Sequence, residues 1–436
     1  MKFYNREKEI QLLQKIEKLS KETAQMTFVT GRRRIGKTNL LVKASENKEM
    51  IYLFVTKKSE ALLCQEFIET IENSLNIRIL GSFTKFSKLF EYILELTKEK
   101  HLTVVIDEFQ EFFTINESVY SEMQKLWDAY KSKCKINLIL CGSVNSLMTK
   151  IFTDKKEPLF GRATQRLQVQ VFDIKTLKEI LSDYSPNYTQ EDLLAFYTFT
   201  GGVAKYVELL VQEKALTKKA ILDVLFSDNS LFLEEGKNVL IDEFGKEYGN
   251  YFSILSLIAS GKTARNEIES ILEMQTGGFL DRLENNFGLI TKHRPIFSKP
   301  NSRKVKYAIT DNFLSFWFRF IYKNKSAIEI NNLDYVKEIV LRDYETFTGI
   351  TLEKYFKQKL IEEKKYNQIG SYWGKNNENE IDIVAVNDLK KIILIGEVKR
   401  NPKKINIEML KNKSKKLLTN FDDYKVRFKG FSIEEM

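Results

Sequence analysis

Residues 31–38 combine glycine, lysine and threonine at the spacing of a phosphate-binding loop. They follow a β-rich apolar run at 26–30 and precede a helical pattern at 39–44. Glycines allow backbone N–H groups to surround phosphate oxygens, and the N-terminus of a helix favours negative charge. Lys37 would reach the β- and γ-phosphates, and Thr38 would bind Mg²⁺. The nucleotide-binding residues predicted here are Gly31, Arg32, Arg33, Arg34, Ile35, Gly36, Lys37, Thr38 and Asn39.

Two acidic residues end a second apolar run, at 102–106. Asp107 would hold Mg²⁺ through water, and Glu108 would orient or deprotonate the water that attacks the γ-phosphate. Strands often end in Asp or Glu, so this pair indicates a nucleotide site only because a phosphate-loop pattern precedes it in the sequence. Together the two segments predict a site that binds ATP with Mg²⁺ and hydrolyses the ATP.

Two further polar residues follow or precede apolar runs in the same region. Ser143 comes just after the run at 137–141, and it would either sense the γ-phosphate or cap the helix that follows. Arg162 stands on a loop before the fifth run, at 167–172. It would stabilise transition-state charge across a subunit interface, or it would be an ordinary surface residue.

A second group of carboxylates lies near the C-terminal end. Alternation along a strand places Glu380 and Asp382 on one face of the run at 381–386, and Glu397 and Lys399 on one face of the next run. If the two runs pair as a hairpin, Asp382, Glu397 and Lys399 lie near the same edge. Two carboxylates can hold Mg²⁺, and a lysine can polarise the water that attacks a phosphodiester. The alternative is an amphipathic hairpin with solvated charges.

The elements that must position these residues begin with an α/β domain. Five β-rich runs alternate with longer amphipathic stretches, at 27–30, 51–55, 102–106, 137–141 and 167–172. This alternation predicts a parallel sheet with helices on both faces.

The pattern then becomes helical and later returns to α/β. Helical periodicity fills 173–240, and residues 250–310 read as three short helices followed by two strands, which describes a winged helix. A long amphipathic helix and further strands follow. The predicted domains are an ATPase core at 1–172, a helical lid at 173–240, a winged helix at 241–325 and an α/β domain at 326–436.

The wing of the predicted winged helix is basic. Between residues 291 and 306 it contains Lys292, Arg294, Lys299, Arg303, Lys304 and Lys306 and no acidic residue. Such a cluster would contact nucleic acid without reading its sequence, or it would be solvated or packed within the chain. The predicted recognition helix, at 277–286, has one arginine against two carboxylates, which argues against sequence-specific base reading.

Composition excludes several classes of chemistry. The chain has 436 residues, with 69 Lys and Arg against 59 Asp and Glu, a net charge of +10 that permits acidic partners. With only two His, a multi-histidine metal centre is impossible, and the three Cys show no C-x-x-C spacing. No stretch approaches the roughly 18 apolar residues of a membrane span. We expect a cytoplasmic protein with reduced thiols and no membrane contact.

The first half resembles the AAA+ class of P-loop ATPases, and within it the archaeal-type ATPase family. The matching segments are residues 3–9, 31–38, 107–108, 142–143, 159–162 and 200–206. The resemblance implies that residues 5–7, Arg6 among them, lie near the adenine. It also implies that the lid motif closes over the nucleotide, and it leaves open a homo-oligomer in which Arg162 acts on a neighbour.

The C-terminal part resembles the restriction-endonuclease-like PD-(D/E)xK nucleases. The matching residues are Asp382, Glu397 and Lys399, and the segments around 370–374 and 380–382 are similar to a nuclease-related domain often fused to archaeal-type ATPases. The resemblance implies catalytic and metal-binding roles for the two carboxylates and a catalytic role for the lysine. Glu353 matches an acidic position on the preceding helix, or forms an ordinary helix pair. Residues 399–416 carry eight basic side chains that could grip a phosphate backbone.

The sequence therefore predicts an ATPase that regulates a Mg²⁺-dependent, nuclease-like domain acting on nucleic acid, with DNA favoured over RNA. The rival hypothesis is a nucleotide-driven switch whose C-terminal fold is a binding module without cleavage activity. A pure transcription regulator is disfavoured by the acidic recognition helix.

Overall fold

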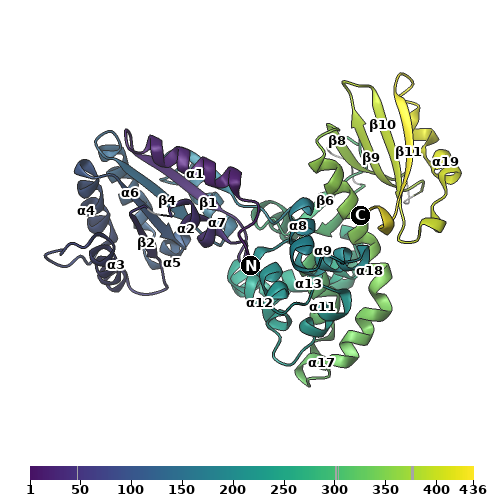
Figure 1. Ribbon diagram of the computed structural model, residues 1–436, viewed down its shortest axis with the longest axis horizontal. Helices are drawn as coiled ribbons and strands as arrows, with labels where there is room; N and C mark the ends of the chain where they lie inside the picture. The colour runs from purple at the N-terminus through teal and green to yellow at the C-terminus, as the bar shows by residue number, and fades with distance from the viewer. Residues whose placement is uncertain (47, 300–301, 303, 375–377) are drawn as a thin grey trace. The chain divides into compact units, whose positions relative to one another are not determined.

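The computed structural model describes residues 1–436 except 47, 300, 301, 303 and 375–377. Arg303 of the predicted wing lies outside the described residues. Contacts divide the chain into two compact units, Lys2–Val171 and Phe172–Met436, the latter together with Met1. Figure 1 shows a sheet with helices in the first unit and, in the second, a largely helical part followed by a smaller sheet.

The first unit contains the predicted parallel sheet, with strand order β2-β3-β4-β1-β5. Four of its strands lie within a residue or two of the predicted runs. The fifth is shorter than predicted, because its partner β1 ends at Thr30, opposite Gln168, and beyond that residue no strand is available for pairing. The strands are β1 (Gln25–Thr30), β2 (Met50–Phe54), β3 (Leu102–Asp107), β4 (Ile136–Cys141) and β5 (Gln165–Gln168).

Helices cover both faces of this sheet. On one face, Leu13 of α1 and Leu41 of α2 pack against Val29 and Val105 of the strands. On the other face, the neighbouring strand residues pack against the remaining helices in a larger aromatic-rich core. The helices are α1 (Glu7–Leu19), α2 (Lys37–Ala44), α3 (Glu60–Leu75), α4 (Phe86–Glu99), η1 (Phe109–Glu111), α5 (Phe112–Ile115), α6 (Ser118–Tyr130) and α7 (Asn145–Thr153).

The second unit begins with five helices in the region predicted as a lid. The last of them continues through the boundary predicted between residues 240 and 241. They are α8 (Ile174–Tyr184), α9 (Gln190–Thr200), α10 (Ala204–Gln212), α11 (Lys218–Leu225) and α12 (Leu231–Phe244).

Three helices, α13 to α15, and the hairpin β6–β7 follow in the order expected for a winged helix, and further short helices come after the hairpin. The predicted helix at 277–286 is an α-helical turn that continues as a π-helical turn, Arg282–Asn286. The elements are η2 (Gly245–Glu247), α13 (Tyr248–Ala259), α14 (Arg265–Leu272), α15 (Gly277–Asp281), β6 (Ile290–His293), β7 (Lys306–Ile309), α16 (Asn312–Phe316), a π-helical turn (Trp317–Ile321), η5 (Tyr322–Asn324) and α17 (Lys325–Glu329).

The chain closes with a four-stranded sheet in the order β11-β10-β9-β8. The predicted hairpin is present as the antiparallel pair β9 and β10, and β11 returns parallel to β10 after a helical crossover. The edge strands β8 and β11 were not predicted. The elements are α18 (Leu333–Glu362), β8 (Gln368–Tyr372), β9 (Ile381–Asn387), β10 (Ile392–Val398), η7 (Pro402–Lys404), α19 (Ile407–Leu418), β11 (Lys425–Phe431) and η8 (Ile433–Glu435).

The two helices α18 and α19 lie on opposite faces of this sheet. Leu410 and Leu417 of α19 pack against Ile393 and Ile395, while Phe356 of α18 meets the ring of Phe431. In the part of the chain that the structure describes, no helix is both long and apolar enough to span a membrane.

Candidate functional site

The predicted phosphate loop connects the end of β1 to the start of α2. Gly36 has φ 89° just before the helix, a left-handed conformation that glycine adopts without a steric cost. Gly31 is needed for a different reason, since a Cβ there would lie 2.9 Å from the carbonyl oxygen of Val169. The backbone of the loop and the first turn of α2 therefore form a path that only glycines at these two positions permit.

Lys37 is folded onto the loop that carries it. Its Nζ donates to the carbonyl oxygens of Gly31, at 2.8 Å, and Arg32, at 3.0 Å. Burial lowers the pKa of Lys37, and the nearby Cys141, Glu108 and Asp107 oppose that shift. The ammonium group is thus held inside the loop, near the acidic ends of the neighbouring strands.

The two predicted Mg²⁺ ligands of this site are adjacent. The Thr38 hydroxyl donates to Oδ2 of Asp107 at 3.3 Å. Asp107 is buried, and its Oδ1 accepts a hydrogen bond from the backbone N–H of Glu108 at 2.9 Å. A hydroxyl and a carboxylate are hard oxygen ligands, so this donor set fits Mg²⁺ beside a nucleotide.

Tyr52 also belongs to this cluster, although no pattern in the sequence singled it out. Its hydroxyl donates to the same Oδ2 of Asp107, and burial together with this bond raises the pKa of Tyr52. Strand β2 pairs with β3 in parallel, with Tyr52 beside Val105. The register of two strands about fifty residues apart brings the phenol to the carboxylate.

Glu108 and Ser143 meet at the carboxyl ends of β3 and β4. The Ser143 hydroxyl donates to Oε2 of Glu108 at 2.8 Å, and Nε of Arg33 approaches the same hydroxyl at 3.4 Å. Ser143 is not the helix cap, because α7 has Val144 at its N-cap with no side-chain hydrogen bond. Of the two sequence-based alternatives, the helix cap is therefore wrong.

Arg6 lies behind the phosphate loop. Its guanidinium is nearly buried and donates to the carbonyl oxygen of Gln170 at 2.7 Å and to that of Ile35 at 3.5 Å, and it pairs with Glu9 at 3.2 Å. These bonds fasten the N-terminal segment to the loop. Proximity of Arg6 to the adenine stays a prediction.

Arg162 is paired with residues of its own unit. Its guanidinium pairs with Asp128 of α6 at 3.0 Å and donates to the carbonyl oxygen of Phe160 at 2.9 Å. The side chain is 26% exposed. Its action on a neighbouring subunit stays a prediction.

The predicted C-terminal residues come together at one end of the β9–β10 hairpin. The register pairs Gly396 with Ile383, which sets Glu397 opposite Asp382. Lys399 Nζ lies 3.6 Å from Oδ2 of Asp382 and 3.7 Å from Oε1 of Glu397. The hairpin thus brings all three predicted residues within ion-pair distance.

Each carboxylate of this C-terminal site has further partners. Oδ2 of Asp382 accepts the backbone N–H of Val398 at 2.8 Å. Glu397 accepts the backbone N–H of Asn406 at 3.2 Å and pairs with Lys413 of α19 at 3.6 Å. Lys413 is a functional candidate that the sequence did not single out, because its contact depends on how α19 packs on the sheet.

Glu353 on α18 faces the same site. Burial raises its pKa to about 7; Lys357 opposes the shift, and the carboxylates of Asp382 and Glu380 add to it. Glu353 also pairs with Lys357 at 3.7 Å, which is the ordinary helix pair named above as the alternative. Its role as the acidic residue of a nuclease-like site stays a prediction.

The described residues contain no group of three His, Cys, Asp or Glu placed to hold a metal ion by themselves. Mg²⁺ usually keeps several waters and takes one or two protein carboxylates. Asp382 and Glu397 fit that more modest donor set.

The wing is packed within the chain. The N–H of Ile296 donates to the carbonyl oxygen of Ser371 at 2.8 Å, on the edge strand β8. Lys306 pairs with Glu380 at 2.8 Å, and its Nζ lies 4.8 Å from the centre of the Trp373 ring. The intramolecular alternative therefore describes these wing residues.

The arginine of the predicted recognition helix contacts other residues of this chain. Arg282 pairs with Glu247 at 2.8 Å and lies over the rings of Tyr251 and Phe279, at 5.6 and 5.0 Å. The guanidinium is thus engaged by its own domain.

Arg400, next to Lys399, links the C-terminal sheet to the helical region. Its guanidinium pairs with Glu191 of α9 at 2.7 Å and donates to Oγ1 of Thr348 on α18 at 2.7 Å. It also lies 5.4 Å from the centre of the Tyr344 ring. No sequence pattern marks this contact, since Glu191 and Arg400 are more than two hundred residues apart.

Two family models match the chain. One, described as an ATPase domain predominantly from Archaea, matches residues 3–210. The other, described as archaeal and bacterial proteins of unknown function, matches residues 317–418, which include Asp382, Glu397 and Lys399.

One relative is similar over nearly the whole length. An uncharacterized protein of Methanocaldococcus jannaschii is 31% identical over 437 residues, covering 97% of this chain and 93% of that protein. The aligned sequence of this relative therefore spans both units of the chain.

Solved structures support the fold. A Walker-type ATPase of Pyrococcus abyssi superposes with a TM-score of 0.54 at 18% identity, covering 72% of this chain and 96% of that one. The ORC2 protein of Aeropyrum pernix, solved with nucleotide, superposes with a TM-score of 0.51 at 15% identity, covering 78% and 96%. At these identities the similarity concerns the fold.

Proposed function

Because this chain belongs to the family of ATPases found predominantly in Archaea, we propose that its nucleotide cycle controls a nuclease-like site in its C-terminal domain. The chain is a P-loop ATPase. The observation that supports the second activity is the position of the Lys399 ammonium group, 3.6 Å from Oδ2 of Asp382 and 3.7 Å from Oε1 of Glu397.

In the ATPase, each residue has a role that its position supports. Lys37 supplies positive charge for the β- and γ-phosphates, and Glu108 orients the attacking water. Ser143 holds the Glu108 carboxylate and would sense the γ-phosphate. Mg²⁺, held by Thr38 and Asp107, would neutralise phosphate charge when bound.

In the nuclease-like site, Asp382 and Glu397 would hold Mg²⁺, which supplies Lewis acidity to the scissile phosphate. Lys399 would position the attacking water between them. Glu353, with a pKa near 7, would exchange a proton with that water at neutral pH.

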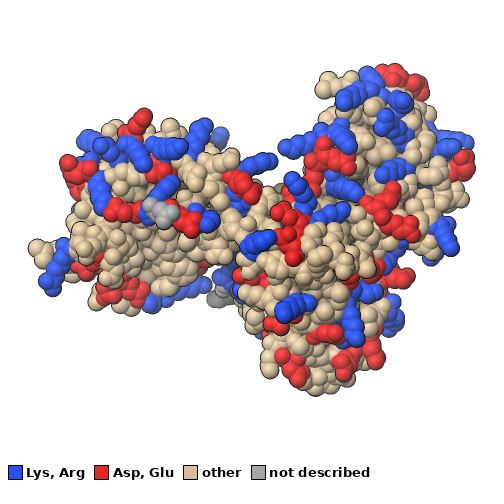
Figure 2. All heavy atoms as spheres, in the orientation of Figure 1, with Lys and Arg blue, Asp and Glu red and all other residues tan. Residues whose placement is uncertain are grey.

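The substrate we propose is nucleic acid, with DNA favoured over RNA. Exposed basic residues follow the site along η7 and α19, and they would bind phosphates without reading bases. They are Lys403, Lys404, Lys411, Lys415 and Lys416. In Figure 2, Lys and Arg side chains are spread over this part of the molecule.

We also propose that the chain consists of four functional domains, at residues 1–172, 173–240, 241–325 and 326–436. Arg400 would connect the nuclease-like site to α9 of the lid through Glu191. A homo-oligomer in which Arg162 reaches a neighbour's nucleotide is part of the same proposal, and a cytoplasmic location follows from its substrates.

The experiment incubates labelled DNA and RNA with the full chain, with and without Mg²⁺ and ATP. Matched reactions use Lys37→Ala and Asp382→Asn. We expect Asp382→Asn to lose cleavage while it retains ATP hydrolysis, and Lys37→Ala to lose ATP hydrolysis. Cleavage that survives in Asp382→Asn would reject the C-terminal site.

A second candidate function has its own support. The carboxylates of Asp382 and Glu397 are already engaged by Lys399, Lys413 and two backbone N–H groups. Such internal pairing suits a binding module driven by the ATPase as a switch. Intact ATP hydrolysis without cleavage of any substrate, at any Mg²⁺ concentration, would favour this function.

A further inference from the structure

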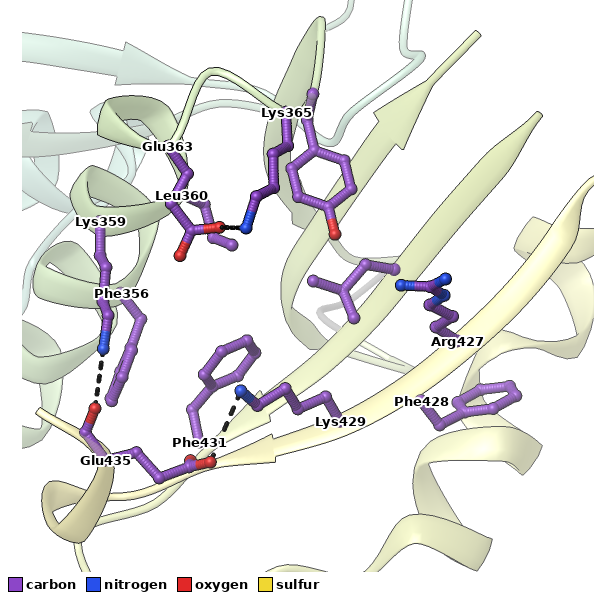
Figure 3. Close-up of a pocket in the computed structure, with 12 residues that line it drawn as sticks. Phe356, Lys359, Leu360, Glu363, Lys365, Arg427, Phe428, Lys429, Phe431 and Glu435 are labelled. Carbon is purple, nitrogen blue, oxygen red and sulfur yellow. Dashed lines mark hydrogen bonds and ion pairs between the residues drawn. The ribbon is translucent and has the colours of Figure 1, made fainter. Parts of the chain in front are cut away.

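A cavity of about 380 Å³ lies on the α18 side of the C-terminal sheet (Figure 3). The last turns of α18, strands β10 and β11 and the short helix η8 surround it. Leu394 of β10 lines it, whereas Ile393 and Ile395 on the same strand pack toward α19. Because side chains alternate along a strand, the cavity and Glu397 lie on opposite faces of the sheet. The cavity is therefore separate from the nuclease-like site.

The inner wall of the cavity is apolar. Phe356, Leu360, Leu394 and Phe431 are all buried, and the rings of Phe356 and Phe431 lie 4.9 Å apart at an angle of 41°. A wall of this kind favours a flat apolar group, because burying ring surface against it releases water.

The rim of the cavity is basic. Figure 3 shows Lys359, Lys365, Arg427 and Lys429 around it, with two carboxylates, Glu363 and Glu435. Lys365 pairs with Glu363 at 2.9 Å, and Lys429 with Glu435 at 3.5 Å. Four cations against two carboxylates leave an excess of two positive charges.

Two of the four cations form no ion pair with a carboxylate in the part of the chain that the structure describes. Lys359 donates to the backbone carbonyl oxygen of Glu435 at 2.8 Å, and its pKa is lowered by burial and by nearby Lys429. Arg427 is exposed, and its guanidinium forms no hydrogen bond or ion pair with the described residues of the chain. Its planar guanidinium can bind a phosphate through two parallel hydrogen bonds.

We propose that this cavity binds a small ligand in which a planar ring is joined to a phosphate monoester, of the size of a nucleoside monophosphate. A phosphate monoester carries a charge of roughly −1.5 to −2 at pH 7, which matches the excess on the rim. The cavity volume falls within the range of roughly 300–1,000 Å³ typical of small-molecule sites. The ring would lie on the phenylalanine wall, and the phosphate would face Arg427 and Lys365.

Isothermal titration of the full chain with AMP, GMP, CMP and UMP tests this site. The titration is run on the wild type and on Gly31→Ala, whose phosphate loop should not bind nucleotide, so that binding common to both proteins belongs to the cavity. We expect at least one nucleotide to bind with a stoichiometry of one. Inorganic phosphate alone and the matching nucleoside alone should each bind at least about tenfold more weakly, since each lacks half of the contacts.

Variants of the rim locate the binding. Arg427→Ala should weaken binding by about tenfold or more, because a charge-assisted hydrogen bond is lost, and Lys365→Ala should weaken it as well. Lys425→Ala is the matched control: it removes an exposed cation two residues away on β11 that does not line the cavity, and it should leave binding unchanged.

Three results would overturn the proposal: no binding of any of the four nucleotides, equal binding of nucleoside and nucleotide, or unchanged binding in both Arg427→Ala and Lys365→Ala. A 5′-phosphorylated dinucleotide separates two sources of the same chemistry. Competition with the bound mononucleotide assigns the cavity to the end of a nucleic-acid strand, and absence of competition assigns it to a free nucleotide. None of these results depends on ATP hydrolysis or cleavage.

Discussion

The hydroxyl of Ser143 donates a hydrogen bond to the carboxylate of Glu108, with 2.8 Å between Oγ and Oε2. This contact joins the ends of two neighbouring strands and fixes the side chain proposed to orient the attacking water. A carboxylate that is held in one rotamer needs no reorganisation at the moment of reaction.

Ser143→Ala should therefore reduce the kcat of ATP hydrolysis by about tenfold to a hundredfold, the value of a hydrogen bond to a charged group. The Kd for ATP should change little. Steady-state hydrolysis and nucleotide binding measured on the same preparation separate the two effects. Thr153→Ala is a control outside this contact, because the Thr153 hydroxyl on the next helix donates to the carbonyl oxygen of Thr149. A Ser143→Ala enzyme with an unchanged kcat would show that Glu108 does not depend on this bond.

Gly31→Ala should abolish ATP binding and lower the free energy of unfolding of the first unit by about 1–3 kcal/mol. The added Cβ would lie 2.9 Å from the carbonyl oxygen of Val169, at a φ of 152°, which strains the loop. Denaturant unfolding and nucleotide binding measure the two effects. Gly81→Ala, where φ is also positive but no atom lies within 4 Å, should cost less stability and leave ATP binding intact.

In both candidate sites, some residues could be predicted from the sequence around them and others could not. Asp382 and Glu397 were predicted because alternation on two adjacent strands and a short turn fix their relation. The phosphate loop was predicted because its eight residues are contiguous. Both rest on contacts between nearby segments, where local geometry decides the outcome.

Tyr52, Lys413 and Arg400 escaped prediction because their partners are set by long-range packing. Tyr52 reaches Asp107 through the register of β2 and β3, and Lys413 reaches Glu397 through the docking of α19. Strand β11 was missed for a related reason. Its charged residues alternate along an exposed edge of the sheet, so it lacks the apolar run that marked β9 and β10.

Stability should depend on pH through Glu353. Its pKa is 4.5 as an ordinary glutamate and about 7 in the folded chain, so the folded state favours the protonated form. The stabilisation is complete below about pH 4.5 and is lost as the pH rises through 7. Glu353→Gln stays neutral, so its Tm relative to the wild type should increase across this window. We expect only about 2–4 °C, because the side chain is 35% exposed and partly screened.

Thermal unfolding of both proteins at several pH values measures this difference. Glu345→Gln, which replaces a carboxylate on the same helix, controls for the loss of one charge. A constant difference in Tm between wild type and Glu353→Gln, from pH 4.5 to pH 7.5, would contradict the raised pKa.

Ile296→Asp should release the wing from the C-terminal sheet. Ile296 is partly buried against the core between that sheet and α19, and a carboxylate there would lose part of its hydration without gaining a partner. Hydrogen exchange should become faster at β8, the edge strand that the wing covers, by about tenfold or more. Lys299→Ala removes an exposed cation of the same wing and should leave exchange at β8 unchanged. Equal exchange in all three proteins would mean that the wing does not protect the edge.

The contact between Arg400 and Glu191 should couple the lid region to the nuclease-like site. The two side chains are 18% and 27% exposed and 2.7 Å apart, so their interaction should exceed that of a surface pair. A double-mutant cycle with Arg400→Ala and Glu191→Ala should give a coupling of about 1–3 kcal/mol in the free energy of unfolding. Lys218→Ala supplies the control, because Lys218 approaches Glu191 more loosely, at 3.5 Å. A coupling near zero would leave Arg400 as a packing residue. A measured coupling would make it an energetic connection between α9 and the residue next to Lys399, since the arginine follows that lysine directly in the chain.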